Sequence, residues 1–320
     1  MYSQALVKVA LSALSYTQDE LAHRLGVPSA QIGKWTTGES MSPEMAEKVR
    51  ALASIGVKDP SFVLWAGSLE DAAKWEKLIH FLAQTASRNA ETGYGTLPLE
   101  DAEGMLCWST FHALREMGVA LPKPFPAELD FDYERAYHHV NDGLWELLLE
   151  KSPYSALIYK LYMSLNDVYG FYAAYVEALI FDDELRLAGT AADNIEPCLI
   201  DLAACKIAVE EALAPKIIQF RCRVMKDYEG WLTIVKDGAI RAGVPLRAEL
   251  LAMVHQSARE LGWEAEAESL GLNARRAHPD VYMNELLSSM RAVRRILPAV
   301  MKKLGIEADA LKPDRMKGNE

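Results

Sequence analysis

The chain has 320 residues, of which half are hydrophobic, and a formal net charge of −11. This length allows two or more domains, and this apolar content can fill a large core. No stretch approaches the ~18 uncharged apolar residues of a membrane-spanning helix, and the first residues lack the pattern of a signal peptide. The four cysteines form no CxxC pair, which is typical of buried thiols in a reducing compartment. We therefore expect a cytoplasmic protein that does not bind membranes.

Charge is distributed unevenly along the chain. Residues 1–58 hold six basic and five acidic side chains, and residues 275–320 hold ten basic and six acidic ones. The segment 59–274 therefore carries a net charge of about −16. Because an acidic surface repels nucleic acids and membranes, we expect any DNA contact near the two ends of the chain.

The first predicted element is a helix before residue 15, with apolar side chains at helical spacing: Leu6, Val9, Ala10 and Ala13. Thr17, with Glu20 three residues later, has the capping-box pattern of a helix start. The apolar side chains that follow are Leu21, Ala22 and Leu25. Gly26 predicts the end of this helix, because glycine adopts the left-handed conformation at little steric cost.

A second short helix is predicted to begin at Pro28-Ser29. Its Ile32 and Trp35 are three residues apart and are expected to face the core. Gln31 and Lys34 fall on the opposite side of the same helix. The turn therefore leads into a second helix that has one apolar face and one polar face.

Gly38 predicts the end of the second helix, and Ser42-Pro43 begins another. With these signals in place, residues 6–55 resemble the helix-turn-helix domain of the Cro and lambda-repressor type, also called the xenobiotic-response-element family. The chain departs from the family pattern at Trp35, where an aliphatic residue is usual, and at Thr36-Thr37-Gly38, where Glu-x-Gly is common. The residues that match are Thr17, Gln18, Glu20, Leu21, Ala22, Leu25, Gly26, Val27, Ile32 and Gly38.

The resemblance implies that the second helix of the motif enters the major groove of double-stranded DNA. By position, the residues that it assigns to base reading are Ser29, Ala30, Gln31 and Lys34. The residues that it assigns to phosphate contacts are Gln18 and Thr37. Since phosphate neutralisation drives most affinity and this domain is nearly neutral, we expect a homodimer that presents two copies to a palindromic operator. The alternative is a helix-turn-helix that only mediates assembly.

Beyond the motif the pattern is helical almost throughout, and no convincing alternating strand occurs, so we expect an all-α fold. We predict a DNA-binding domain over 1–56, a connector over 57–68, and a helical domain over 69–320 for dimerisation, sensing or partner binding. The proline-rich stretch within 119–129 is a candidate internal boundary. The later helices are predicted at 131–150, 153–181, 190–212, 214–242, 246–261 and 279–304.

Tyrosines crowd the segment 154–175, and the candidates for an interface or ligand pocket are Tyr159, Tyr162, Tyr169 and Tyr172. Tyrosine combines a large apolar area with a polar tip, so it suits a dimer interface, a small-molecule pocket, or a core with wet edges. A second cluster, on the last predicted helix, could contact phosphates or pair with the acidic middle: Arg291, Arg294, Arg295, Lys302 and Lys303.

Catalytic signatures are missing from the sequence. There is no HExxH zinc pattern, no phosphate-cradling glycine-rich loop and no GxSxG elbow. We therefore expect no enzyme, metal or cofactor. The leading hypothesis is a bacterial or phage transcription regulator, most simply a repressor, that receives a signal from a small-molecule effector or a protein partner. The alternative is an antitoxin-like or phage-defence component, whose acidic body binds a basic partner and whose DNA binding serves autoregulation.

Overall fold

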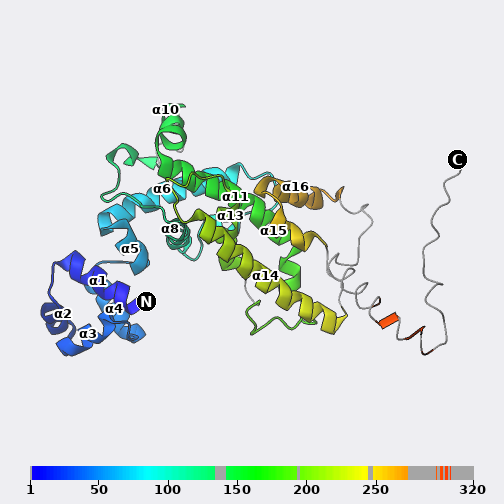
Figure 1. The fold of residues 1–320 in the computed structure, drawn as a ribbon. Coiled ribbons are helices and arrows are strands. Elements are labelled where there is room, and N and C mark those ends of the chain that lie inside the picture. The colour runs from blue at the N-terminus through cyan, green and yellow to red at the C-terminus, as the bar shows by residue number, and fades with distance from the viewer. Residues whose placement is uncertain are drawn as a thin grey trace.

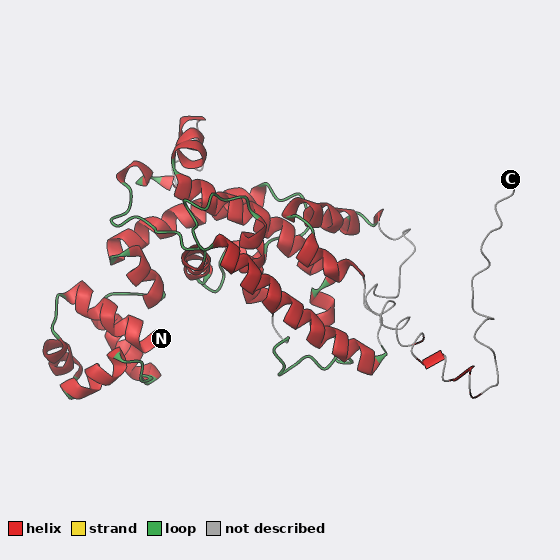
Figure 2. Ribbon diagram, in the orientation of Figure 1, coloured by secondary structure: helices red, strands yellow, loops and turns green. Residues whose placement is uncertain are grey.

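The computed structural model describes residues 2–133, 142–192, 195–243 and 248–272, with a few single positions between 293 and 303. Every regular element within these residues is a helix, in total fifteen α-helices with short 3-10 and π segments (Figure 2). The expectation of an all-α fold is therefore confirmed. No helix in the described part of the chain is long and apolar enough to cross a membrane.

Four short helices gather at one end of the molecule (Figure 1). They are α1 (Tyr2–Leu14), α2 (Gln18–Leu25), α3 (Ser29–Thr36) and α4 (Pro43–Leu52). Helix α1 packs against both α3 and α4, and it buries Leu6, Val9 and Ala10. Ala13, which we expected on the same apolar stripe, is exposed. The start of α4 is as predicted, because the Ser42 side chain accepts a hydrogen bond from the Met45 amide at 3.3 Å.

Helix α5 (Pro60–Ala66) lies within the segment expected to be a connector. Asp59 caps it by accepting hydrogen bonds from the amides of Ser61 and Phe62, at 2.7 and 3.1 Å. Helix α5 packs against α1 on one side and against α6 (Leu69–Arg88) and α8 (Leu106–Glu116) on the other. One continuous apolar core therefore runs from the N-terminal helices into the rest of the chain.

The body of the molecule is organised around α11 (Pro153–Tyr175), which packs against α6, α13 (Leu199–Lys206) and α16 (Ala258–Ser269) (Figure 1). Burial on several sides explains its apolar composition, because a helix that is hydrophobic all round needs neighbours on every face. The remaining elements are α7 (Leu97–Glu100), η1 (Ala127–Leu129), α10 (Asp142–Trp145), η2 (Glu146–Lys151), α12 (Glu177–Ile180), η3 (Glu196–Cys198), α14 (Ile217–Ala242), η4 (Ala248–Leu251) and α15 (Ala252–His255).

Several predicted boundaries were wrong. The helix expected over 246–261 is broken into η4, α15 and α16, because Ser257 and Glu260 form a capping box that starts a new helix. The helix expected over 190–212 reduces to η3 and α13, and Ile207 then adopts an extended conformation. Residues 134–141 of the predicted 131–150 helix lie outside the described residues. So does most of the predicted 279–304 helix, including the basic residues Arg291, Arg294, Arg295 and Lys302.

Candidate nucleic-acid interface

The first helix of the motif, α2, is fixed at both ends by its own sequence. The Thr17 hydroxyl accepts a hydrogen bond from the Glu20 amide at 3.3 Å, and the Glu20 carboxylate accepts one from the Thr17 amide at 2.7 Å. The bond from the Thr17 amide, with a second one from the Thr17 hydroxyl to the same carboxylate at 2.9 Å, holds the pKa of Glu20 below its ordinary value. At the other end Gly26 has φ 69° and ψ 34°, the left-handed conformation that closes a helix. Both ends of α2 are as predicted.

Helix α3 is seated by two side chains, Ile32 and Trp35, which are 0% and 5% exposed. The outward face carries the residues assigned to base reading. Ser29, Ala30 and Lys34 are exposed, and Gln31 is half-buried. The predicted division of α3 into a core face and an outer face is therefore correct.

Residues of α1 hold the far end of α3, a contact that the sequence did not reveal. Gln4 donates a hydrogen bond from Nε2 to the Thr36 carbonyl oxygen at 2.9 Å. The Ser3 hydroxyl accepts one from the Met41 amide at 2.9 Å. These contacts span more than thirty residues of sequence, so no local pattern could indicate them. These two hydrogen bonds fix the direction of α3 relative to α1.

Of the two residues assigned to phosphate contacts, Thr37 already uses its hydroxyl in hydrogen bonds within the protein. Gln18 is the first residue of α2 and is exposed. Thr37 is also exposed, but its hydroxyl donates to the carbonyls of Lys34 and Gly33, at 2.9 and 3.2 Å. A threonine hydroxyl has one hydrogen to donate. A phosphate at Thr37 would have to take that hydrogen from the end of α3.

Glu39, which follows the end of α3, touches two of the assigned reading residues. Its Oε1 accepts a hydrogen bond from Gln31 Nε2 at 3.1 Å, and its Oε2 lies 3.8 Å from Lys34 Nζ. The Glu39 amide also donates to the Lys34 carbonyl at 3.0 Å. Glu39 was not among the residues predicted from the sequence, although an acidic residue just after the motif's closing glycine was a visible signal.

The four candidate tyrosines lie mostly in the interior. Tyr162 is fully buried, its hydroxyl is 2.7 Å from Thr110 Oγ1, and burial raises its pKa well above the ordinary value. Tyr169 and Tyr172 are buried side by side, with ring centroids 5.5 Å apart. Only Tyr159 is half-buried, and its hydroxyl accepts a hydrogen bond from Asn89 at 2.9 Å. A role for these tyrosines in an interface or a ligand pocket stays a prediction.

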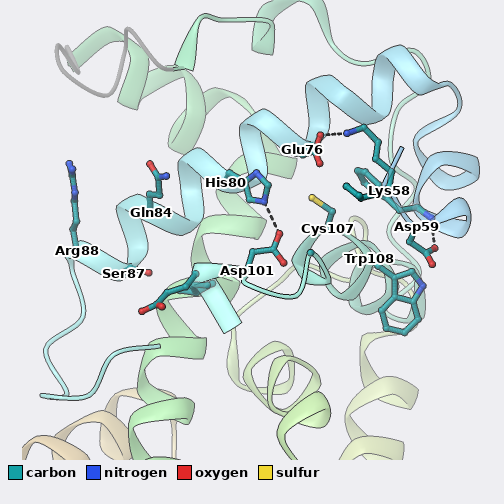
Figure 3. A pocket seen from close by; sticks show the side chains of 15 residues that line it. Lys58, Asp59, Glu76, His80, Gln84, Ser87, Arg88, Asp101, Cys107 and Trp108 are labelled. Atoms are coloured by element: carbon teal, nitrogen blue, oxygen red, sulfur yellow. Dashed lines mark hydrogen bonds and ion pairs between the residues drawn. The ribbon is translucent and has the colours of Figure 1, made fainter. Parts of the chain in front are cut away.

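A pocket of about 690 Å³, lined by both charged and apolar side chains, lies elsewhere, between α6 and the segment that leads into α8 (Figure 3). Residues 57–59, just before α5, are part of its lining. Its wall carries an ion pair between Lys58 and Glu76, and a hydrogen bond between His80 Nε2 and Asp101 Oδ2 at 2.8 Å. Cys107 is also part of the lining, and burial raises the pKa of its thiol, so the thiol stays protonated at neutral pH. None of the four candidate tyrosines lines this pocket.

The pocket wall is tied to the N-terminal helices through Arg50 of α4. Its guanidinium donates hydrogen bonds to the carbonyls of Gly56 and Lys58, at 2.5 and 3.1 Å. The same group donates to the Tyr2 hydroxyl at 2.8 Å. Arg50 therefore joins α1, α4 and the chain segment that borders the pocket.

Neither a metal site within the described residues nor a similar protein gives further evidence on the function of the α2–α3 surface. Within the described residues no group of three or more His, Cys, Asp or Glu side chains could hold a metal ion. No protein-family model matches the chain, and no curated protein and no solved structure matches it either. The resemblance to the Cro and lambda-repressor type therefore rests on the residues of the motif alone.

Proposed function

We propose that this chain is a sequence-specific DNA-binding transcription regulator, most simply a repressor, in which α3 reads the major groove. The observation that carries the proposal is the geometry of α2 and α3. Helix α2 ends at a left-handed glycine, and α3 follows after a short turn with its apolar face buried. The opposite face of α3 presents small and hydrogen-bonding side chains to solvent, which suits contact with base edges.

The proposed assembly is a homodimer on a palindromic operator. Residues 1–58 carry nearly equal numbers of basic and acidic side chains, so one copy gains little from phosphate neutralisation. Two linked copies bind two half-sites with a high effective concentration, which restores affinity without new contacts. The helical body, which shares a core with the N-terminal helices, is then the part that brings the two copies together.

The proposal is tested by binding of the full-length protein to DNA from upstream of its own gene. Replacing Gln31 and Lys34 together by alanine should weaken specific binding roughly 30-fold or more, since two base contacts are lost and each good contact contributes about 1–3 kcal/mol. Fluorescence anisotropy measures the affinity, and light scattering should find two chains per operator.

A matched control replaces the same two residue types, glutamine and lysine, at positions outside α3. Gln84 and Lys77 are both exposed on α6, and replacing these two by alanine should leave the affinity within about twofold, because they lie outside the reading surface. Equal affinities of the wild type and the Gln31/Lys34 variant would show that α3 does not read bases.

The acidic middle of the chain favours a second candidate function. A net charge of about −16 over residues 59–274 attracts basic surfaces and steers their association. In this proposal the body binds and blocks a basic protein partner, and DNA binding serves autoregulation. Purification of the tagged chain from its native host distinguishes the two, because a regulator without a protein partner is recovered alone.

A further inference from the structure

The loop after α3 places a carboxylate against the proposed reading surface. Glu39 contacts Gln31 at 3.1 Å and Lys34 at 3.8 Å. The side chains of Lys34 and Glu39 are 60% and 49% exposed, so all of these groups are at the surface that would meet DNA. The other acid–base pair of this region, Glu44 with Lys48, is a local contact within α4 at 2.9 Å. Glu39 instead joins two different residues of α3.

The contact with Glu39 determines which donors and acceptors Gln31 can offer to a base. A glutamine side chain has two N–H donors and one carbonyl acceptor. Once one N–H is given to Glu39, one donor and one acceptor remain. Adenine presents the matching pair in the major groove, an acceptor at N7 and a donor at N6, whereas guanine presents two acceptors. The geometry therefore favours adenine opposite Gln31.

Lys34 is affected by the same carboxylate in a different way. A lysine ammonium has only donors, so it suits the two acceptors of guanine or a phosphate oxygen. Glu39 attracts this ammonium toward itself and offsets its charge. A carboxylate on a DNA-facing surface also repels phosphates, and the phosphate term supplies much of the affinity of DNA-binding proteins. Glu39 is thus expected to lower affinity while it narrows base choice.

We propose that Glu39 is a specificity-determining residue that orients Gln31 for adenine and weakens the contacts of Lys34 with guanine and phosphate. This inference rests on the proposed function, since it assigns a role within the same DNA-reading surface. In this role Glu39, which lies outside α3, sets both the base preference of the reading surface and its affinity for DNA.

The experiment compares full-length wild-type protein with Glu39→Ala, Glu39→Gln and Glu47→Ala in selection from a random duplex library. Wild-type protein should select adenine at one position of each half-site. Glu39→Ala should admit guanine at that position and bind roughly fivefold tighter near 0.1 M salt, because one more phosphate charge is neutralised. The slope of log affinity against log salt should steepen by about one.

The two other variants separate charge from orientation. Glu39→Gln removes the charge but keeps an oxygen that can accept from Gln31, so affinity should rise while the adenine preference is kept. Glu47 is an exposed acid of α4, and Glu47→Ala makes the same change of net charge, so it should alter neither base preference nor salt slope by a comparable amount. Circular dichroism confirms that each variant is folded.

Two results would overturn the inference, and they can be told apart. A wild-type protein that selects no sequence contradicts the proposed function itself, and the role of Glu39 is lost with it. A wild-type protein that selects a sequence, with a Glu39→Ala variant identical in base preference and salt slope, contradicts only the role of Glu39. Relaxed preference together with tighter binding in Glu39→Ala supports it.

Discussion

Asp167 on α11 is a carboxyl group in an unfavourable environment. A β-carbon added at Gly262 of α16 would lie 2.1 Å from Asp167 Oδ1, so the carboxyl sits directly over the backbone of the neighbouring helix. Burial, with the nearby charge of Glu91, raises the pKa of Asp167 from 3.8 to about 6, and Arg259 partly opposes the shift. Because the folded chain holds this proton more tightly than the unfolded chain, Asp167 lowers stability as pH rises from about 4 to 6.

Asp167→Asn should therefore make stability less sensitive to pH in this window. The free energy of unfolding of the variant should exceed that of the wild type at pH 7 by about 1–2 kcal/mol, since solvent partly screens the carboxyl, and the difference should shrink toward pH 4. Urea unfolding at pH 4, 5, 6 and 7 measures it. Glu150 is an exposed acid, so Glu150→Gln serves as the control. A constant offset at all four pH values would contradict the role of Asp167.

At the scale of elements, the packing of α11 depends on a glycine, Gly170, which has no side chain. Gly170 is buried where the turn at Thr92 crosses α11, and a β-carbon at Gly170 would lie 2.5 Å from the β-carbon of Thr92. Asn166, one turn earlier, accepts a hydrogen bond from the Thr96 hydroxyl at 2.8 Å and donates one to the Ala86 carbonyl at 2.7 Å. These contacts hold the turn over residues 92–96 against α11, and Asn166 also joins α11 to α6.

Gly170→Ala should therefore destabilise the protein, by about 1–3 kcal/mol, because the added methyl group has no space. Gly230 of α14 provides the matched control, since nothing lies within 4 Å of the position that its β-carbon would occupy. Gly230→Ala should raise stability by about 1 kcal/mol, the difference in helix propensity between the two residues. Chemical denaturation measures both. Equal effects of the two substitutions would show that the close approach of Thr92 has no energetic consequence.

Prediction from the sequence was accurate where the signal is local. The capping box at Thr17, the left-handed Gly26 and the cap at Ser42 each follow from residues within one turn of the helix end, and all three are present. The start of α16 carried an equally local signal, yet a helix was expected to continue through it. Contacts such as Glu39 with Gln31, or His80 with Asp101, depend on how loops and helices meet in space, so spacing along the chain does not indicate them.

At the scale of the whole molecule, the N-terminal helices are attached to the body through α5 and Arg50. Helix α5 packs against α1, and Arg50 binds the carbonyls of Gly56 and Lys58 together with the Tyr2 hydroxyl. A charged donor that serves several acceptors contributes more than a neutral one. This attachment sets the orientation in which the proposed reading helix is presented.

Arg50→Ala should loosen this attachment without unfolding the body. Amide hydrogens of residues 54–58 should exchange at least several-fold faster, since a lost hydrogen bond to a charged group costs about 1.5–3 kcal/mol locally. Exchange of α11 should be unchanged. Hydrogen exchange followed by mass spectrometry measures both regions. Arg24→Ala, at an exposed residue of α2, is the control, and an exchange pattern like that of this control would contradict a fastening role for Arg50.

The central place of α11 has a consequence for synthesis on the ribosome. Its partner α16 begins at residue 258, more than eighty residues after α11 ends, and the Tyr175 hydroxyl donates to the Glu264 carbonyl of that late helix at 3.2 Å. At about 5–20 residues per second, roughly 4–16 seconds pass between the synthesis of α11 and the synthesis of α16, which covers this face. During this interval one apolar face of α11 lacks its partner helix, so we expect the nascent chain to bind chaperones that act while translation continues.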